Sequence, residues 1–221
     1  MKKYPKYKPS GVEWIGDIPE HWEVKKLKWI CKFEYGNSLA INDREDGNVP
    51  VYGSNGITGY CSLSITKAPC IIIGRKGSFG KINWSFEKCF PIDTTYYIDE
   101  DRSKENLRWL FYLLNNLGLD SFSRDTGVPG LSREDAYLKL IPIPSIDEQI
   151  TIANFLNEKT TLINKLIIQK QKLIGLLKEE RTAIINQAVT CGINPNIKLK
   201  PSGIDWLRDI PENWEVKKLK Y

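Results

Sequence analysis

Histidine and methionine are almost absent from this chain of 221 residues, which contains one of each, and long apolar runs are missing altogether. A membrane-spanning helix needs about 18 or more consecutive apolar residues. The polar opening from Met1 to Lys8 is followed by no apolar segment of the kind found in secretory signals. We therefore expect a cytoplasmic protein that does not associate with membranes.

Cysteine pairs at metal-binding spacings are also missing. The chain has five cysteines, an odd number, and no Cys-x-x-Cys pair. The odd number argues against a closed disulfide framework, and the absent pair argues against a structural zinc site. We expect reduced thiols, no metal and no other cofactor. The cysteines are Cys31, Cys61, Cys70, Cys89 and Cys191.

The motifs that catalysis requires are incomplete. The run from Gly74 to Lys81 resembles a phosphate-binding loop, but a Walker A motif needs glycine where Arg75 stands and serine or threonine where Ile82 stands. It is not a dinucleotide fingerprint either. With His21 as the only histidine, Cys–His and Ser–His catalysis lack a base. We expect no catalytic residues and a protein that is not an enzyme.

The positive charge lies mainly at the two ends of the chain. The formal net charge is +5, of which residues 1–28 carry +3 and residues 192–221 carry +2, whereas residues 29–145 carry −1. A general basic surface for nucleic acid is therefore not expected in the central part. One local exception is the segment 67–88, where five basic residues face one acid.

A long internal repeat is the strongest feature of the sequence. Residues 8–28 and 200–220 are identical at 16 of 21 positions, at an offset of 192. This period is too long for a solenoid, whose repeats are about 20 to 50 residues long. We interpret each copy as a structural clasp built around its tryptophans, and ligand contact is the alternative. His21 is replaced by Asn213 in the second copy, which argues against a base or a metal ligand there.

Residues 29–144 are predicted to form a sheet-rich domain. Residues 71–73 and 94–98 have the β-branched and aromatic side chains of buried strands, and glycine-rich turns separate such runs. Ser103 and Ser132 are each expected to cap a helix. Prolines in the segment 141–144 end the domain, since proline does not fit a helix interior.

From Ser145 to Cys191 the sequence predicts one long helix. Ser145 and Glu148 form a capping box, and Gly175 is the only glycine or proline before the end. Such a helix is a rod of about 66 Å, too long to bury its apolar stripe on a domain of this size, so we expect a partner helix in a coiled coil. A helix folded over its own domain is the alternative. The expected seam is Ala153, Leu156, Ile163, Ile167, Ile174, Leu177, Ile184 and Ala188.

The order of the motifs resembles the specificity (S) subunits of type I restriction-modification systems over almost the whole chain. Each motif alone is weakly specific, whereas their order and the duplicated opening are distinctive. The segments that carry the resemblance are 14–22, 51–60, 72–81, 93–96, 127–132, 143–149 and the long helix.

This resemblance implies an α+β chain with one target-recognition domain and half the length of an S subunit. It divides the sequence into a first clasp (1–28), a DNA-binding target-recognition domain (29–144), a spacer helix (145–191) and a second clasp (192–221). It also implies double-stranded DNA with a split target site, methyltransferase (M) subunits and a restriction (R) translocase-nuclease subunit as partners. The long helix would pair with that of a second S half or of a second copy.

Polar side chains in the loops of the recognition domain are the candidate DNA contacts. Arg75 and Lys76 lie in a glycine-rich turn that can approach a phosphate or a base edge, or they lie in a turn whose charges are merely solvated. The resemblance favours the same role for residues in neighbouring loops: Asn55, Ser78, Lys81, Thr95, Arg124 and Thr126.

Two other functions remain open at this point. The chain could be an assembly adaptor that does not read sequence, or the remnant of a fused restriction-methylation enzyme.

The expected pairing of two copies through the long helix predicts the form of the DNA target. In an isologous antiparallel dimer, identical recognition domains would face an interrupted palindrome. The rod length predicts half-sites roughly two helical turns apart.

Overall fold

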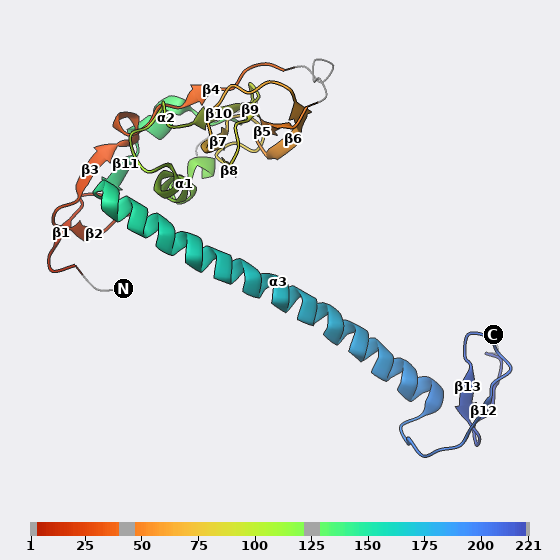
Figure 1. Ribbon diagram of the computed structural model, residues 1–221. Coiled ribbons are helices and arrows are strands. Elements are labelled where there is room, and N and C mark those ends of the chain that lie inside the picture. Colours follow the sequence, from red (N-terminus) through yellow and green to blue (C-terminus); the bar gives the residue numbers. More distant parts are fainter. Residues whose placement is uncertain (1–3, 40–46, 122–128, 220–221) are drawn as a thin grey trace. The chain divides into compact units, whose positions relative to one another are not determined.

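The computed structural model describes residues 4–39, 47–121 and 129–219 (Figure 1). It divides into two compact units, residues 1–157 and 158–221. Helix α3 (Ile146–Cys191) begins in the first unit and ends in the second. The finer division into four segments stays a prediction.

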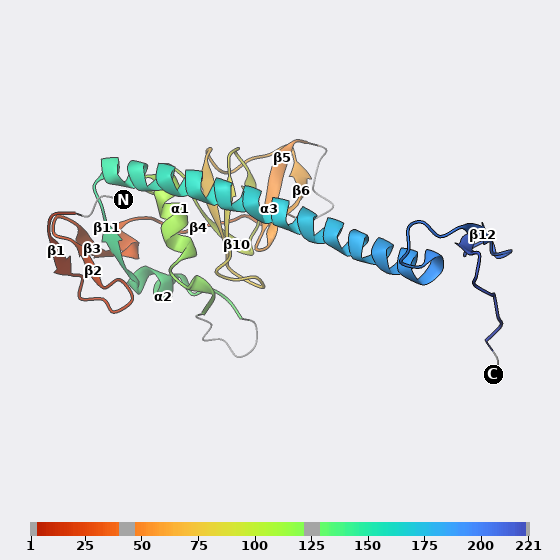
Figure 2. The same cartoon turned by 90° about the horizontal axis from the view of Figure 1, so that it is seen from below.

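The first clasp and the last strand of the sheet-rich domain form one structure. Strands β1 (Tyr7–Pro9) and β2 (Asp17–Pro19) make an antiparallel hairpin, and β3 (Glu23–Lys26) pairs antiparallel with β11 (Leu140–Ile143). Leu27, which is fully buried, extends this contact by donating its N–H to the Lys139 carbonyl at 2.8 Å. Figures 1 and 2 both show these four strands together at one end of the first unit.

A four-stranded antiparallel sheet forms the centre of the first unit. Its second and third strands are the predicted ones, and each Ile of the 71–73 run is fully buried because this strand lies inside the sheet. The strands in order are β4 (Glu34–Tyr35), β10 (Thr95–Ile98), β7 (Cys70–Gly74) and β8 (Ile82–Ser85).

A smaller three-stranded sheet lies beside it in the order β6, β5, β9. Strands β5 (Val49–Gly53) and β6 (Gly56–Cys61) form a hairpin in which Gly53 pairs with Gly56. Gly56 has a φ of 127°, a conformation that suits glycine. Strand β9 (Phe90–Pro91) pairs with β5 in parallel.

Two short helices contribute to the core of the first unit. Helix α1 (Leu107–Asn115) packs on β7 and β8 of the central sheet, and α2 (Arg133–Leu138) packs on the short 3-10 helix Leu27–Trp29. Ser132 caps α2 as predicted, accepting from the Asp135 N–H. The prediction for Ser103 was wrong, because Asn106 caps α1 by accepting from the Trp109 N–H. Ser103 instead donates its hydroxyl to the Ile30 carbonyl at 2.9 Å and so ties the loop before α1 to the segment directly after the clasp.

Helix α3 has the predicted length and start. The Glu148 N–H donates to the Ser145 hydroxyl, and the Glu148 carboxylate accepts from the Ser145 N–H, as a capping box requires. Gln149, which is fully buried, accepts from the Asn106 N–H at 2.9 Å and so joins the helix to the start of α1. Within the described part of the chain, no helix is long and apolar enough to cross a membrane.

The second unit ends in a hairpin that repeats the first one. Strands β12 (Leu199–Pro201) and β13 (Asp209–Pro211) pair in the register of β1 and β2. The repeat therefore encodes the same local hairpin twice.

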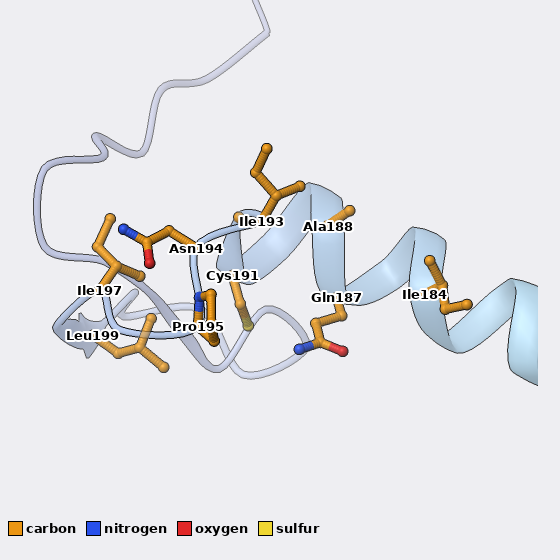
Figure 3. Close-up of a pocket in the computed structure, with 10 residues that line it drawn as sticks. Ile184, Gln187, Ala188, Cys191, Ile193, Asn194, Pro195, Ile197 and Leu199 are labelled. Carbon is orange, nitrogen blue, oxygen red and sulfur yellow. The ribbon is translucent and has the colours of Figure 1, made fainter.

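The end of α3 and the segment that follows it line one hollow. Figure 3 shows the side chains around it, from Ile184 to Leu199.

Candidate nucleic-acid interface

Three loops meet where strands β7 and β10 adjoin. The loop 75–81 leaves β7, the turn 92–94 precedes β10, and residues 54–55 join β5 to β6. Gly74 N–H donates to the Lys81 carbonyl and Gly80 N–H to the Gly74 carbonyl, each at 2.8 Å, which closes the 75–81 loop. A Cβ atom at Gly74 would overlap the Ser78 carbonyl oxygen, so this tight closure requires glycine.

Lys81 and Asn55 come together across two of these loops. The Lys81 ammonium donates to the Asn55 side-chain oxygen at 2.7 Å and to its carbonyl at 3.1 Å. Both residues are exposed. The contact orients a positive charge and an amide on the surface, where both remain accessible to a ligand.

Arg75 and Lys76 are held by their backbones. Both N–H groups donate to the Thr94 carbonyl, and the Arg75 carbonyl accepts from the Leu131 N–H at 2.8 Å. The Arg75 guanidinium donates to the Asp93 carbonyl at 2.9 Å and lies 5.2 Å from the ring centroid of Tyr35. The side chain of Lys76 is exposed.

Thr95 is removed from the candidate DNA contacts. It is fully buried, and its hydroxyl donates to the Ile92 carbonyl at 2.7 Å, so it stabilises the turn before β10. Ser78 is exposed on the 75–81 loop and stays a candidate. Arg124 and Thr126 lie outside the described residues.

Tyr35 and Arg133 belong to the same surface and were not among the predicted residues. The Arg133 guanidinium lies 5.0 Å from the Tyr35 ring centroid. Tyr35 packs on Tyr96, whose pKa is raised by burial; the protonated Tyr96 hydroxyl donates to the Leu131 carbonyl at 3.3 Å. The position of Arg133 directly after the cap Ser132 is the signal in the sequence that could have drawn attention to it.

The predicted helix seam is buried at its start and exposed over most of its length. Ala153 is 2% exposed and packs in the core of the first unit, so it is removed from the seam, and Leu156 is half-buried. Ala188 is half-buried beside the hollow of the second unit. The seam residues between them are 48% to 59% exposed: Ile163, Ile167, Ile174, Leu177 and Ile184.

The family described as the type I restriction modification DNA specificity domain matches residues 19–177, well over half of the chain. The chain belongs to this family. The resemblance inferred from the motifs is thereby confirmed. The assignment of residues 29–144 as the recognition domain stays a prediction, and the term is used below in that sense.

Curated relatives of this specificity-domain chain are specificity subunits. That of the type I restriction enzyme MjaVIII from Methanocaldococcus jannaschii is 24% identical over 217 residues, which covers 92% of this chain and 49% of the relative. The EcoprrI specificity subunit from Escherichia coli is 26% identical over 171 residues, which covers 75% of this chain and 42% of the relative. The chain thus spans about half the length of the curated relatives it matches.

Solved structures show the same fold. A chain from a structure of complex assembly in the type I R-M system aligns with a TM-score of 0.67 at 18% identity, covering 80% of this chain and 48% of that one. The HsdS subunit from Thermoanaerobacter tengcongensis aligns with a TM-score of 0.58 at 19% identity, covering 85% of this chain and 48% of that one. The predicted fold class, a sheet-rich α+β domain followed by a long helix, is confirmed, whereas the coiled coil stays a prediction.

Proposed function

We propose that this chain directs a type I restriction-modification complex to its DNA target and catalyses no reaction itself. The observation that carries the proposal is the convergence of Asn55, Lys81, Arg75 and Lys76 at one edge of the recognition domain. Loops held on a rigid sheet are suited to present side chains to base edges and phosphates. A domain of the DNA specificity family with this surface is best explained as a reader of sequence.

The partners follow from family membership and from the exposed helix. We infer that the recognition domain reads one part of a split site and that methyltransferase and restriction subunits assemble on the same chain. The apolar seam of α3 is half exposed from Ile163 to Ile184, which favours a second helix as its cover, from a second S half or a second copy. The five unpaired cysteines agree with action in the reducing cytoplasm.

Exchange of the recognition domain tests the proposal. Residues 29–144 are replaced by the corresponding residues of a relative with another target, and methylated bases are mapped in cells that also carry the methyltransferase subunit. We expect the methylated sequence to follow the exchanged residues. An unchanged sequence would support an assembly adaptor instead, and methyl transfer by the purified chain alone would support a remnant of a fused enzyme.

A further inference from the structure

Two arginines from distant parts of the chain stack on one aromatic ring. The guanidinium carbons of Arg75 and Arg133 lie 5.2 Å and 5.0 Å from the centroid of the Tyr35 ring. Tyr35 is 41% exposed and belongs to β4, the edge strand of the central sheet. Because the face of an aromatic ring attracts a cation, Tyr35 orients both guanidiniums at the surface.

Backbone contacts fix the same two arginines. Lys76 forms an isolated β-bridge with Gly130, and the Leu131 N–H donates to the Arg75 carbonyl. Arg133 is the first residue of α2, directly after the cap Ser132. The two side chains are therefore presented by one hydrogen-bonded structure, which lowers the entropy cost of binding a ligand between them.

Other stacked arginines of the first unit have internal partners. Arg102 stacks on Tyr97 and donates to the Asp99 carboxylate at 2.8 Å. Arg108 stacks on Trp84 and donates to the Asn157 side chain at 2.6 Å. Both arginines hold parts of the fold together, so stacking alone does not mark a binding site.

Arg75 and Arg133 differ from Arg102 and Arg108, because their guanidiniums make few hydrogen bonds to the described residues. Arg75 donates to one backbone carbonyl, that of Asp93. Arg133 Nε, like Arg102 Nε, is buried without a hydrogen-bond partner among the described residues, and it forms an ion pair at 3.6 Å with Glu134, whose side chain is 74% exposed. Such an exposed ion pair contributes little. Two cations held near each other with spare donors favour an anion between or beside them.

We infer that Arg75, Arg133 and Tyr35 form a phosphate-binding site for the sugar-phosphate backbone of DNA. The planar guanidinium matches two phosphate oxygens at once. This inference rests on the proposed function and assigns the site a positioning role, leaving base reading to the neighbouring loops. It adds Arg133 and Tyr35 to the interface and makes Arg75 a contact to the sugar-phosphate backbone of DNA.

The salt dependence of DNA binding by Arg133→Met tests this site, since methionine keeps an apolar stem for stacking and removes the charge. The probes are a duplex containing the methylated sequence and an unrelated duplex, each bound by the complex of the full chain with its methyltransferase subunit. Loss of one phosphate contact lowers the slope of log K against log salt by about 0.9 and the affinity by roughly fivefold at 0.15 M salt. We expect this loss on both duplexes and an unchanged methylated sequence.

Lys88→Met is the matched control, because it removes one exposed positive charge from the turn between β8 and β9. The slope of log K against log salt for this variant should equal that of the wild type. Arg133→Lys should keep the slope, and Arg75→Met should repeat the loss if Arg133→Met proves unstable in thermal unfolding. A wild-type slope for folded Arg133→Met, or a changed methylated sequence, would overturn the inference. A wild-type complex that does not prefer its target duplex would count against the proposed function instead.

Discussion

Glu148 joins the first turn of α3 to the clasp. Its Oε1 accepts from Trp22 Nε1 at 3.3 Å and lies 2.9 Å from His21 Nε2, while Oε2 accepts from the Ser145 N–H at 3.1 Å. Burial opposes ionisation of this carboxyl, but the hydrogen bonds from His21, Ser145 and Trp22 outweigh it and lower the pKa of Glu148 to about 2. The only histidine of the chain thus has a structural partner.

Replacement of Glu148 by Gln should destabilise the first unit at neutral pH. Hydrogen bonds to a charged group contribute about 1.5 to 3 kcal/mol, and the neutral amide keeps only part of them. We expect a loss of unfolding free energy of about that size in denaturant titrations. Glu179→Gln, on an exposed turn of the same helix, is the control and should change little.

The pH dependence gives the same prediction a second test. Because the pKa of Glu148 lies below its ordinary value near 4.5 in the folded protein, its stabilisation is fully present above about pH 4.5 and is lost as the pH falls toward 2. The difference in unfolding free energy between wild type and Glu148→Gln should therefore shrink as the pH falls below 4.5. A difference that grows as the pH falls from 4.5 to 2 would show that the carboxylate is not the stabilising form.

At the scale of elements, α3 has two distinct faces. Positions spaced by seven residues from Glu158 through Lys165, Lys172 and Glu179 to Asn186 are all polar. The seam from Ile163 to Ile184 follows the alternating spacing of a coiled coil on another side of the helix. A helix of this pattern is stable when a partner covers one side and water the other.

Ile174→Asp should abolish pairing through this helix. Ile174 is 53% exposed, so the substitution changes the isolated chain little, whereas an unpaired carboxylate in a helix interface costs about 3 to 5 kcal/mol, more than a hundredfold in affinity. Light scattering should show a fall in molar mass at micromolar concentration. Lys172→Asp, on the polar face, should keep the wild-type mass, and equal behaviour of the two variants would show that another surface mediates assembly.

The elements that the sequence predicted well are those with local signatures. The 71–73 strand has a buried β-branched run, and α3 has a capping box followed by a long stretch with one glycine. The pairing of β3 with β11 has no such signature, because its partners are more than 110 residues apart in the sequence and proline in β11 is atypical of strands. The cap of α1 was misplaced because serine and asparagine serve equally well as caps.

The candidate site was predicted only where its residues share a local sequence pattern. A glycine-rich loop marks Arg75 and Lys76 in the sequence, and the structure adds the contact between Asn55 and Lys81. Thr95 looked suitable because threonine is polar, but its place in an inner strand buries it. Tyr35 and Arg133 could not be grouped with Arg75, since only the sheet and α2 bring them to one place.

At the scale of the whole molecule, the repeat indicates that one structural unit is used twice. The hairpins β1–β2 and β12–β13 share their register, and Arg208 adopts a φ of 51° where the first copy has Gly16 at 65°. The turn is thus kept although a non-glycine residue is disfavoured in this conformation. Conservation of a costly turn within the chain favours a common structural role for both clasps.

The symmetry of the DNA target tests how such units combine. If two copies of this chain pair through α3, a twofold axis relates identical recognition domains, and each must read the same half-site on opposite strands. We therefore predict that cells given only this chain and a methyltransferase subunit methylate an interrupted palindrome, and that Ile174→Asp abolishes the methylation while Lys172→Asp preserves it. Sequencing of modified bases measures both outcomes. A methylated site with two different halves would show that a second, different recognition domain completes the complex, and the proposed pairing of identical copies would be wrong.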